Sequence, residues 1–85
     1  MAAQFTLLSR EYCHLCHDML EELRLMQARF SFGLEVVDVD SDVALDERYG
    51  EWVPVLLAGN KEICHYHLDR LALETYLKEY GSPCS

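Results

Sequence analysis

The chain has 85 residues, of which 51% are hydrophobic and 26% are charged, and its 15 Asp and Glu outnumber its 7 Lys and Arg. These values indicate one small globular domain and exclude a globally disordered chain. An acidic surface repels a phosphate backbone, so we expect no nucleic acid as a partner. No apolar run approaches the roughly 18–20 residues that span a bilayer, so we expect no membrane association.

The cysteines are Cys13, Cys16, Cys64 and Cys84. Residues 1–5 lack the basic and long apolar stretches of a secretory signal, so we expect a cytoplasmic protein, and we expect it to be a monomer. In a reducing cytosol, cysteines indicate redox or metal chemistry rather than a structural disulfide framework.

The N-terminal half predicts a strand, a helix and a second strand, at residues 5–8, 14–29 and 34–40. The apolar stripe of this helix consists of Met19, Leu23, Met26 and Phe30. Gly33 ends the helical unit, and the second strand is aliphatic enough for a buried position beside the first. A strand–helix–strand unit implies a parallel pair with a right-handed crossover.

Next we expect a short helix that is capped by Ser41 or Asp42, runs to about Tyr49 and is stopped by Gly50. Strands at 55–58 and 61–65 and a helix at about 68–80 follow it. Gly59-Asn60 suits a type II′ hairpin turn. The expected buried face of the last helix is Leu68, Leu71, Ala72, Thr75 and Tyr76.

The order β-α-β-α-β-β-α predicts an α/β fold with a four-stranded mixed sheet and helices on both faces. We expect residues 1–85 to form a single domain, with its core at about 5–80 and a flexible tail at 81–85.

Cys13 and Cys16 form a Cys-x-x-Cys motif between the first strand and the first long helix. If the helix begins near Cys13, its sulfur faces unpaired backbone N–H groups and the positive end of the helix dipole, which lowers the pKa of the thiol. Cys16 lies one turn along, deeper but close enough for a disulfide. We therefore expect Cys13 to attack and Cys16 to resolve the mixed disulfide.

The residues around the motif have two readings each. His14 and His17 favour the Cys13 thiolate when they are protonated, or they are solvated side chains at the start of a helix. Tyr12 forms an apolar wall for a docked thiol partner, or it covers the end of the sheet. Trp52 is expected to be a wall beside the site.

Three segments carry one joint pattern: Phe5-Thr6-Leu7-Leu8 with Cys13-His14-Leu15-Cys16, then Trp52-Val53-Pro54-Val55-Leu56-Leu57, then Gly59-Asn60-Lys61-Glu62-Ile63. Over about residues 5–80 this pattern resembles glutaredoxin, and most of all the small glutaredoxin-like proteins of bacteria. The resemblance implies a thioredoxin-like fold and a thiol–disulfide oxidoreductase or electron carrier. It also implies a cis Val53-Pro54 peptide, with Pro54 facing the cysteines and the Val53 backbone pairing with substrate. The alternative to this family resemblance is that Pro54 simply begins an edge strand.

The chain departs from the glutathione-using glutaredoxins at three places. His14-Leu15 replaces the usual Pro-Tyr pair, and only Arg10 could replace the lysine that precedes the first cysteine. The glycine pair before the last helix is absent from residues 64–69, where Asp69 is either the acidic remnant or a helix cap. These departures argue against glutathione, so we expect no cofactor and a protein thiol or disulfide as the partner. A glutathione mixed disulfide is the alternative substrate.

Other functions were compared with the redox one. Cys13-His14-Leu15-Cys16-His17 matches the haem-attachment signature, but haem attachment follows export and no export signal is present. A zinc or iron–sulfur site would add Cys64 with His65 or His67, in a non-enzymatic metal-binding or redox-sensing module. The thiols could also be vestiges in an interaction domain. We expect no bound metal, and Cys64 is an inert buried residue, an auxiliary thiol or a ligand.

Overall fold

The computed structural model describes residues 3–59 and 61–80. Its elements, in chain order, are β1 (Ala3–Ser9), α1 (His14–Gln27), β2 (Phe32–Asp38), the 3-10 turn η1 (Val39–Ser41), α2 (Val43–Tyr49), β3 (Val55–Ala58), β4 (Lys61–His65) and α3 (Arg70–Tyr80). The expected β-α-β-α-β-β-α order is confirmed. The expected flexible tail at residues 81–85 and the second turn residue, Asn60, lie outside the described residues.

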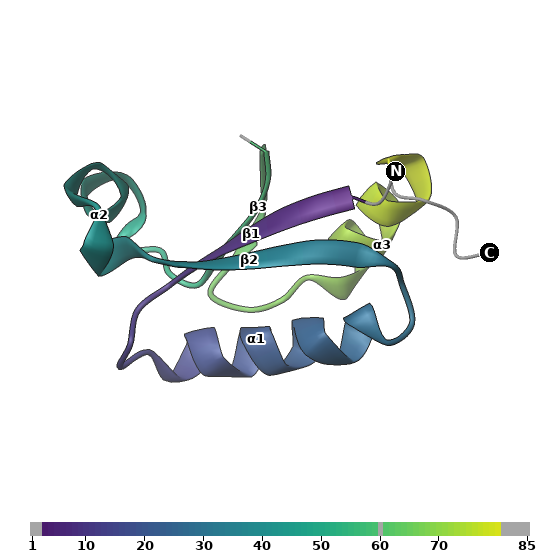
Figure 1. Ribbon diagram of the computed structural model, residues 1–85, viewed down its shortest axis with the longest axis horizontal. Coiled ribbons are helices and arrows are strands. Elements are labelled where there is room, and N and C mark those ends of the chain that lie inside the picture. The colour runs from purple at the N-terminus through teal and green to yellow at the C-terminus, as the bar shows by residue number, and fades with distance from the viewer. Residues whose placement is uncertain (1–2, 60, 81–85) are drawn as a thin grey trace.

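The four strands form one mixed sheet in the order β2-β1-β3-β4. Figure 1 shows β1 and β2 side by side, with α1 running below them. β1 pairs with β2 in parallel and with β3 antiparallel, and β3 pairs with β4 antiparallel. The parallel pair follows from the α1 crossover, and the antiparallel pair from the short turn at Gly59, where φ is +63°.

The two faces of the sheet are covered by different helices. Because side chains alternate along a strand, Phe5 and Leu7 of β1 face α1 and α3, whereas Leu8 faces the side of α2. α1 contributes its expected stripe, with Met19, Leu23 and Met26 buried and Phe30 packed against them. α3 adds Leu73 and Leu77 to the same face, and Leu45 and Tyr49 of α2 pack on the other. Helices on both faces are thus confirmed.

The expectation that the second strand occupies a buried position is wrong. β2 does pair beside β1, but it begins at Phe32, includes Gly33 and lies at the edge of the sheet. Val36 at its centre is 42% exposed. The aliphatic sequence could not reveal this, because strand order depends on pairing between distant segments. Here β1 and β3 take the two inner positions, and β2 lies outside β1.

The expected buried face of the last helix is wrong in part. Leu71 is 74% exposed and Thr75 is exposed, whereas Leu73 and Leu77 are buried. Tyr76 and Leu68 do pack against the core, as expected. Two apolar stripes compete on this short helix. The choice depends on how the chain enters it: Asp69 accepts a hydrogen bond from the Ala72 N–H at 3.0 Å, which fixes the first turn.

Candidate functional site

One end of the sheet collects the residues that the sequence singled out. β1 runs toward this end and leads into Cys13, while β3 starts there directly after Pro54. The register confirms the proximity of the strands, since Leu8 pairs with Val55 and Val55 pairs with His65. The Cys-x-x-Cys loop, the start of β3 and the end of β4 therefore lie at the same end of the sheet.

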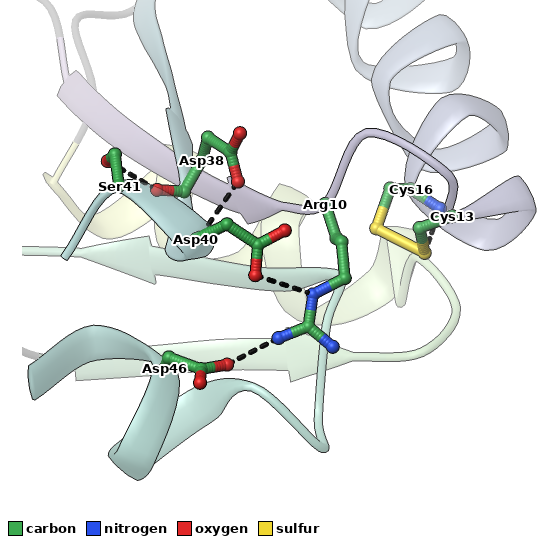
Figure 2. A network of polar contacts seen from close by, with 7 residues as sticks. All are labelled: Arg10, Cys13, Cys16, Asp38, Asp40, Ser41 and Asp46. Carbon is green, nitrogen blue, oxygen red and sulfur yellow. Dashed lines mark hydrogen bonds and ion pairs between the residues drawn. A yellow bond between two sulfur atoms is a disulfide. The ribbon is translucent and has the colours of Figure 1, made fainter. Parts of the chain in front are cut away.

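Cys13 and Cys16 are joined by a disulfide, with their Cα atoms 5.1 Å apart (Figure 2). Cys13 is the N-cap of α1, and its sulfur accepts the backbone N–H of Cys16 at 3.1 Å. Cys16 is 1% exposed, whereas Cys13 is half-buried. The two sulfurs therefore differ in access: an incoming group reaches Cys13 first.

The surroundings of Cys13 are open. Tyr12 is 93% exposed, and His14 and His17 are exposed on the first turn of α1. Together with Cys13 and Glu11 they line a shallow hollow of about 270 Å³. Both histidines and Tyr12 thus lie beside the accessible sulfur.

The Val53-Pro54 peptide is cis, as the family resemblance implied. Pro54 is buried, and its carbonyl accepts the backbone N–H of Tyr66 at 2.9 Å. Val53 is half-buried against the face of the sheet that α2 covers. Pro54 therefore precedes β3, which is an inner strand of the sheet, and does not begin an exposed edge strand.

An aromatic cluster of Trp52, His65 and Tyr66 borders this end of the sheet. Trp52 lies with its ring centroid 5.4 Å from that of His65 and 5.9 Å from that of Tyr66. Tyr66 has a φ of +64°, and a hydrogen bond of 2.7 Å from His67 N–H to the His65 carbonyl closes a three-residue turn around it. This conformation favours glycine. In this chain the residue that adopts it is a tyrosine, in the stretch that lacks the glycine pair of glutathione-using glutaredoxins.

The cluster was only partly predictable. Trp52 was expected to be a wall near the site, but no sequence signal indicated that Tyr66 takes a left-handed conformation, because such a φ is rare for a bulky residue. The Tyr66 hydroxyl also donates to the Glu51 carbonyl at 3.1 Å. Asp69 serves as the helix cap, the second of its two readings.

Arg10, the residue considered as a replacement for the lysine of glutathione-using glutaredoxins, is engaged within the protein. Its guanidinium forms ion pairs with Asp40 of η1 and Asp46 of α2 (Figure 2). The Arg10 backbone, in contrast, faces the motif, since its carbonyl accepts the Cys13 N–H at 3.2 Å. The sequence reasoning missed this network, because its members come from three separate segments.

Cys64 on β4 is half-buried and packs against the main core. Burial raises the pKa of its thiol, and the negative charges of Asp69 and Glu62 add to that effect. The backbone N–H of Asp69 acts in the opposite direction and lowers this pKa. Within residues 3–59 and 61–80, no group of three His, Cys, Asp or Glu side chains is arranged to hold a metal ion.

Comparison with known proteins agrees with this geometry. The structure of thioredoxin 1 from Thermosipho africanus has a TM-score of 0.61 at 20% identity, covering 89% of this chain and 96% of that one, so the two share a thioredoxin-like fold. The model of the glutaredoxin-like domain (DUF836) matches residues 4–78, and the chain belongs to that family.

Several relatives are similar over nearly the full length. Protein Ne2328 from Nitrosomonas europaea is 38% identical, with a TM-score of 0.82 over 89% of this chain and 92% of that protein. Protein XcR50 from X. campestris is 37% identical, with a TM-score of 0.65 over 88% and 96% of the two chains. An uncharacterized protein of Mycobacterium tuberculosis is 28% identical over 94% of this chain and 90% of its own length.

The helices were also compared with what a membrane span requires. Within the described part of the chain, none is both long and apolar enough to cross a bilayer.

Proposed function

We propose that this protein is a thiol–disulfide oxidoreductase that cycles Cys13 and Cys16 between dithiol and disulfide, and that it acts in a reducing compartment such as the cytoplasm. The observation that carries the proposal is the position of Cys13 at the N-cap of α1, where its sulfur accepts the Cys16 N–H. In the reduced protein this N–H and the helix dipole stabilise a thiolate. A thiolate is the form that attacks disulfides.

The difference in burial supports separate roles for the two cysteines. The half-buried Cys13 thiolate would attack one sulfur of a partner disulfide, forming a mixed disulfide and releasing the other partner sulfur as a thiolate. The Cys16 thiol, once deprotonated, would then attack the Cys13 sulfur. That step closes the disulfide and releases the second partner thiol, so two electrons pass from the protein to its partner. An external dithiol or thiol reductant would restore the starting state.

A protein is the partner that the surroundings of Cys13 favour. Tyr12 offers an almost fully exposed ring, and Trp52 is 45% exposed, so both can cover a docked chain around the attacked disulfide. The formal net charge of −8 favours a partner with a basic surface. The engaged Arg10 and the Tyr66 side chain weigh against glutathione as the regular ligand.

The proposal is tested with Cys16→Ser, which removes the resolving thiol. Expressed in cells, this variant should accumulate mixed disulfides between Cys13 and its partners, detected by mass spectrometry after non-reducing purification. The Cys13→Ser/Cys16→Ser variant is the matched control and should capture nothing. Capture of glutathione alone would replace the protein partner with glutathione. Capture of nothing by Cys16→Ser, together with no faster reduction of insulin disulfides than by dithiothreitol alone, would reject the oxidoreductase.

A further inference from the structure

A network centred on Arg10 connects three segments at the active-site end of the sheet. The Arg10 Nε donates to Asp40 Oδ1 at 3.1 Å, and its Nη2 donates to Asp46 Oδ1 (Figure 2). Asp40 is itself held, because its N–H donates to Asp38 Oδ1 at 2.8 Å. One guanidinium thus links the chain after β1 with η1 after β2 and with α2. The planar fork of arginine suits two carboxylates at once, which an ammonium group cannot reproduce.

Gly50 lies at the end of α2, next to this network. Its φ is −55°, so no left-handed backbone requires glycine. Gly50 is buried, however, and a Cβ there would collide with both the carboxylate and the backbone carbonyl oxygen of Asp46, and would lie 3.1 Å from Arg10 Nη2. The missing side chain therefore leaves room at the end of α2 for the Asp46 carbonyl and for the Arg10–Asp46 pair together.

The network acts on the cysteine through the backbone. The Arg10 carbonyl accepts the Cys13 N–H at 3.2 Å, which closes a turn over residues 10–13. Cys13 in turn accepts the Cys16 N–H on its sulfur, at 3.1 Å. Fixing Arg10 therefore fixes the first residue of that turn, and with it the angle at which Cys13 enters α1.

We propose that Arg10, clamped by Asp40 and Asp46, is a positioning residue that holds Cys13 in its N-cap geometry and so sets the thiolate fraction and the reduction potential of the pair. The inference rests on the proposed redox function. Exposed ion pairs contribute little to the free energy of unfolding, and Arg10, Asp40 and Asp46 are 37%, 53% and 50% exposed. The effect of the clamp is therefore expected in the chemistry of Cys13 more than in the stability of the fold.

A direct charge effect of Arg10 predicts a different result, which makes the proposal testable. If Arg10 acted only as a positive charge near Cys13, removing it would lower the thiolate fraction, and removing Asp46 would raise it. If Arg10 acts by positioning, both changes loosen the same turn and both lower the thiolate fraction. The two explanations thus predict opposite signs for the Asp46 variant.

The experiment measures iodoacetamide alkylation of the Cys13 peptide in the reduced protein as a function of pH, together with the reduction potential against glutathione. The variants are Arg10→Gln, Arg10→Lys and Asp46→Ala, and Glu47→Ala is the matched control. Glu47 is an exposed carboxylate on the same helix that takes no part in the network. Circular dichroism establishes that each variant is folded.

Arg10→Gln and Asp46→Ala are each expected to slow alkylation near neutral pH by about three- to tenfold and to make the pair more reducing. Arg10→Lys should recover only part of the rate, and Glu47→Ala should stay within about twofold of the parent. Shifts of opposite sign for Arg10→Gln and Asp46→Ala, or no shift in either, would overturn the proposal. If Arg10→Gln or Asp46→Ala fails to fold, the direction of the change in Cys13 alkylation is taken from the other variant. That direction and the result for Arg10→Lys then decide between positioning and a direct charge effect. Loss of exchange in Cys13→Ser with no shift in these variants would reject the clamp alone, whereas full exchange in Cys13→Ser would reject the proposed function itself.

Discussion

Cys13 and Cys64 are two cysteine positions in the same small fold, and each has a backbone N–H that favours its thiolate. The two cysteines differ in their other surroundings. Cys13 caps a helix of 14 residues, faces an open hollow and has two histidines beside it. Cys64 packs against the core on β4, near the carboxylates of Asp69 and Glu62. One favourable N–H therefore does not make a reactive thiol, because burial and negative charge can outweigh it.

The largest difference between Cys13 and Cys64 is expected when each cysteine is replaced by serine. Cys13→Ser should reduce the rate of insulin disulfide reduction by about 100-fold or more, because the other cysteine of the motif, Cys16, is 1% exposed and cannot reach a partner disulfide. Cys64→Ser should leave the rate within about twofold of the parent, since a buried thiol of raised pKa supplies little thiolate. A large loss of activity in Cys64→Ser, with the fold intact, would make Cys64 a redox partner of the motif.

Alkylation of the native and the unfolded protein sharpens the comparison. In the reduced native protein near neutral pH, the Cys13 peptide should react with iodoacetamide about tenfold or more faster than the Cys64 peptide. In denaturant the two rates should converge to within about twofold, because the difference belongs to the folded environments. Mass spectrometry of the separate peptides also keeps Cys84 apart from both. Equal native rates would contradict the environments described above.

The raised pKa of Cys64 also predicts a dependence of stability on pH. The unfolded thiol ionises at its usual pKa while the folded thiol still holds its proton, so the unfolded state binds fewer protons in alkaline solution. The free energy of unfolding should therefore fall as the pH rises past the usual pKa of a thiol, and should level off above the raised folded pKa. Urea unfolding of the Cys13–Cys16 oxidised form at about pH 8 and about pH 10 measures this. Cys64→Ala should show a smaller fall, and an equal fall in both would assign the effect to other groups.

The smallest expected effect isolates one charge next to Cys64. Asp69→Asn keeps the backbone N–H that lowers the pKa of Cys64 and keeps a side-chain oxygen able to cap α3. It removes one of the negative charges that raise the pKa of Cys64. Alkylation of Cys64 should therefore become about two- to threefold faster, while that of Cys13 stays unchanged. A slower Cys64 reaction would mean that the cap had been lost, which the helical circular dichroism signal would reveal.

Much of the site could be predicted from the sequence because it is local. The Cys-x-x-Cys spacing puts Cys13 and Cys16 one turn apart wherever a helix begins at the motif, and the strand before it orients that helix. The Val53-Pro54 step was likewise readable through the family resemblance. The Arg10 network was not readable, because its carboxylates are 30 and 36 residues away along the chain.

The order of the elements, the parallel first pair and the stripe of α1 were determined by the sequence itself, since hydrophobic periodicity and turn residues act within a few residues of one another. Tertiary structure decided which strand lies at the edge and which side of α3 faces inward, giving an exposed Val36 and a buried Leu73. It also decided that Arg10 pairs with α2 and that Tyr66 takes a left-handed turn. These choices depend on contacts between distant segments, and a pattern along one segment does not record them.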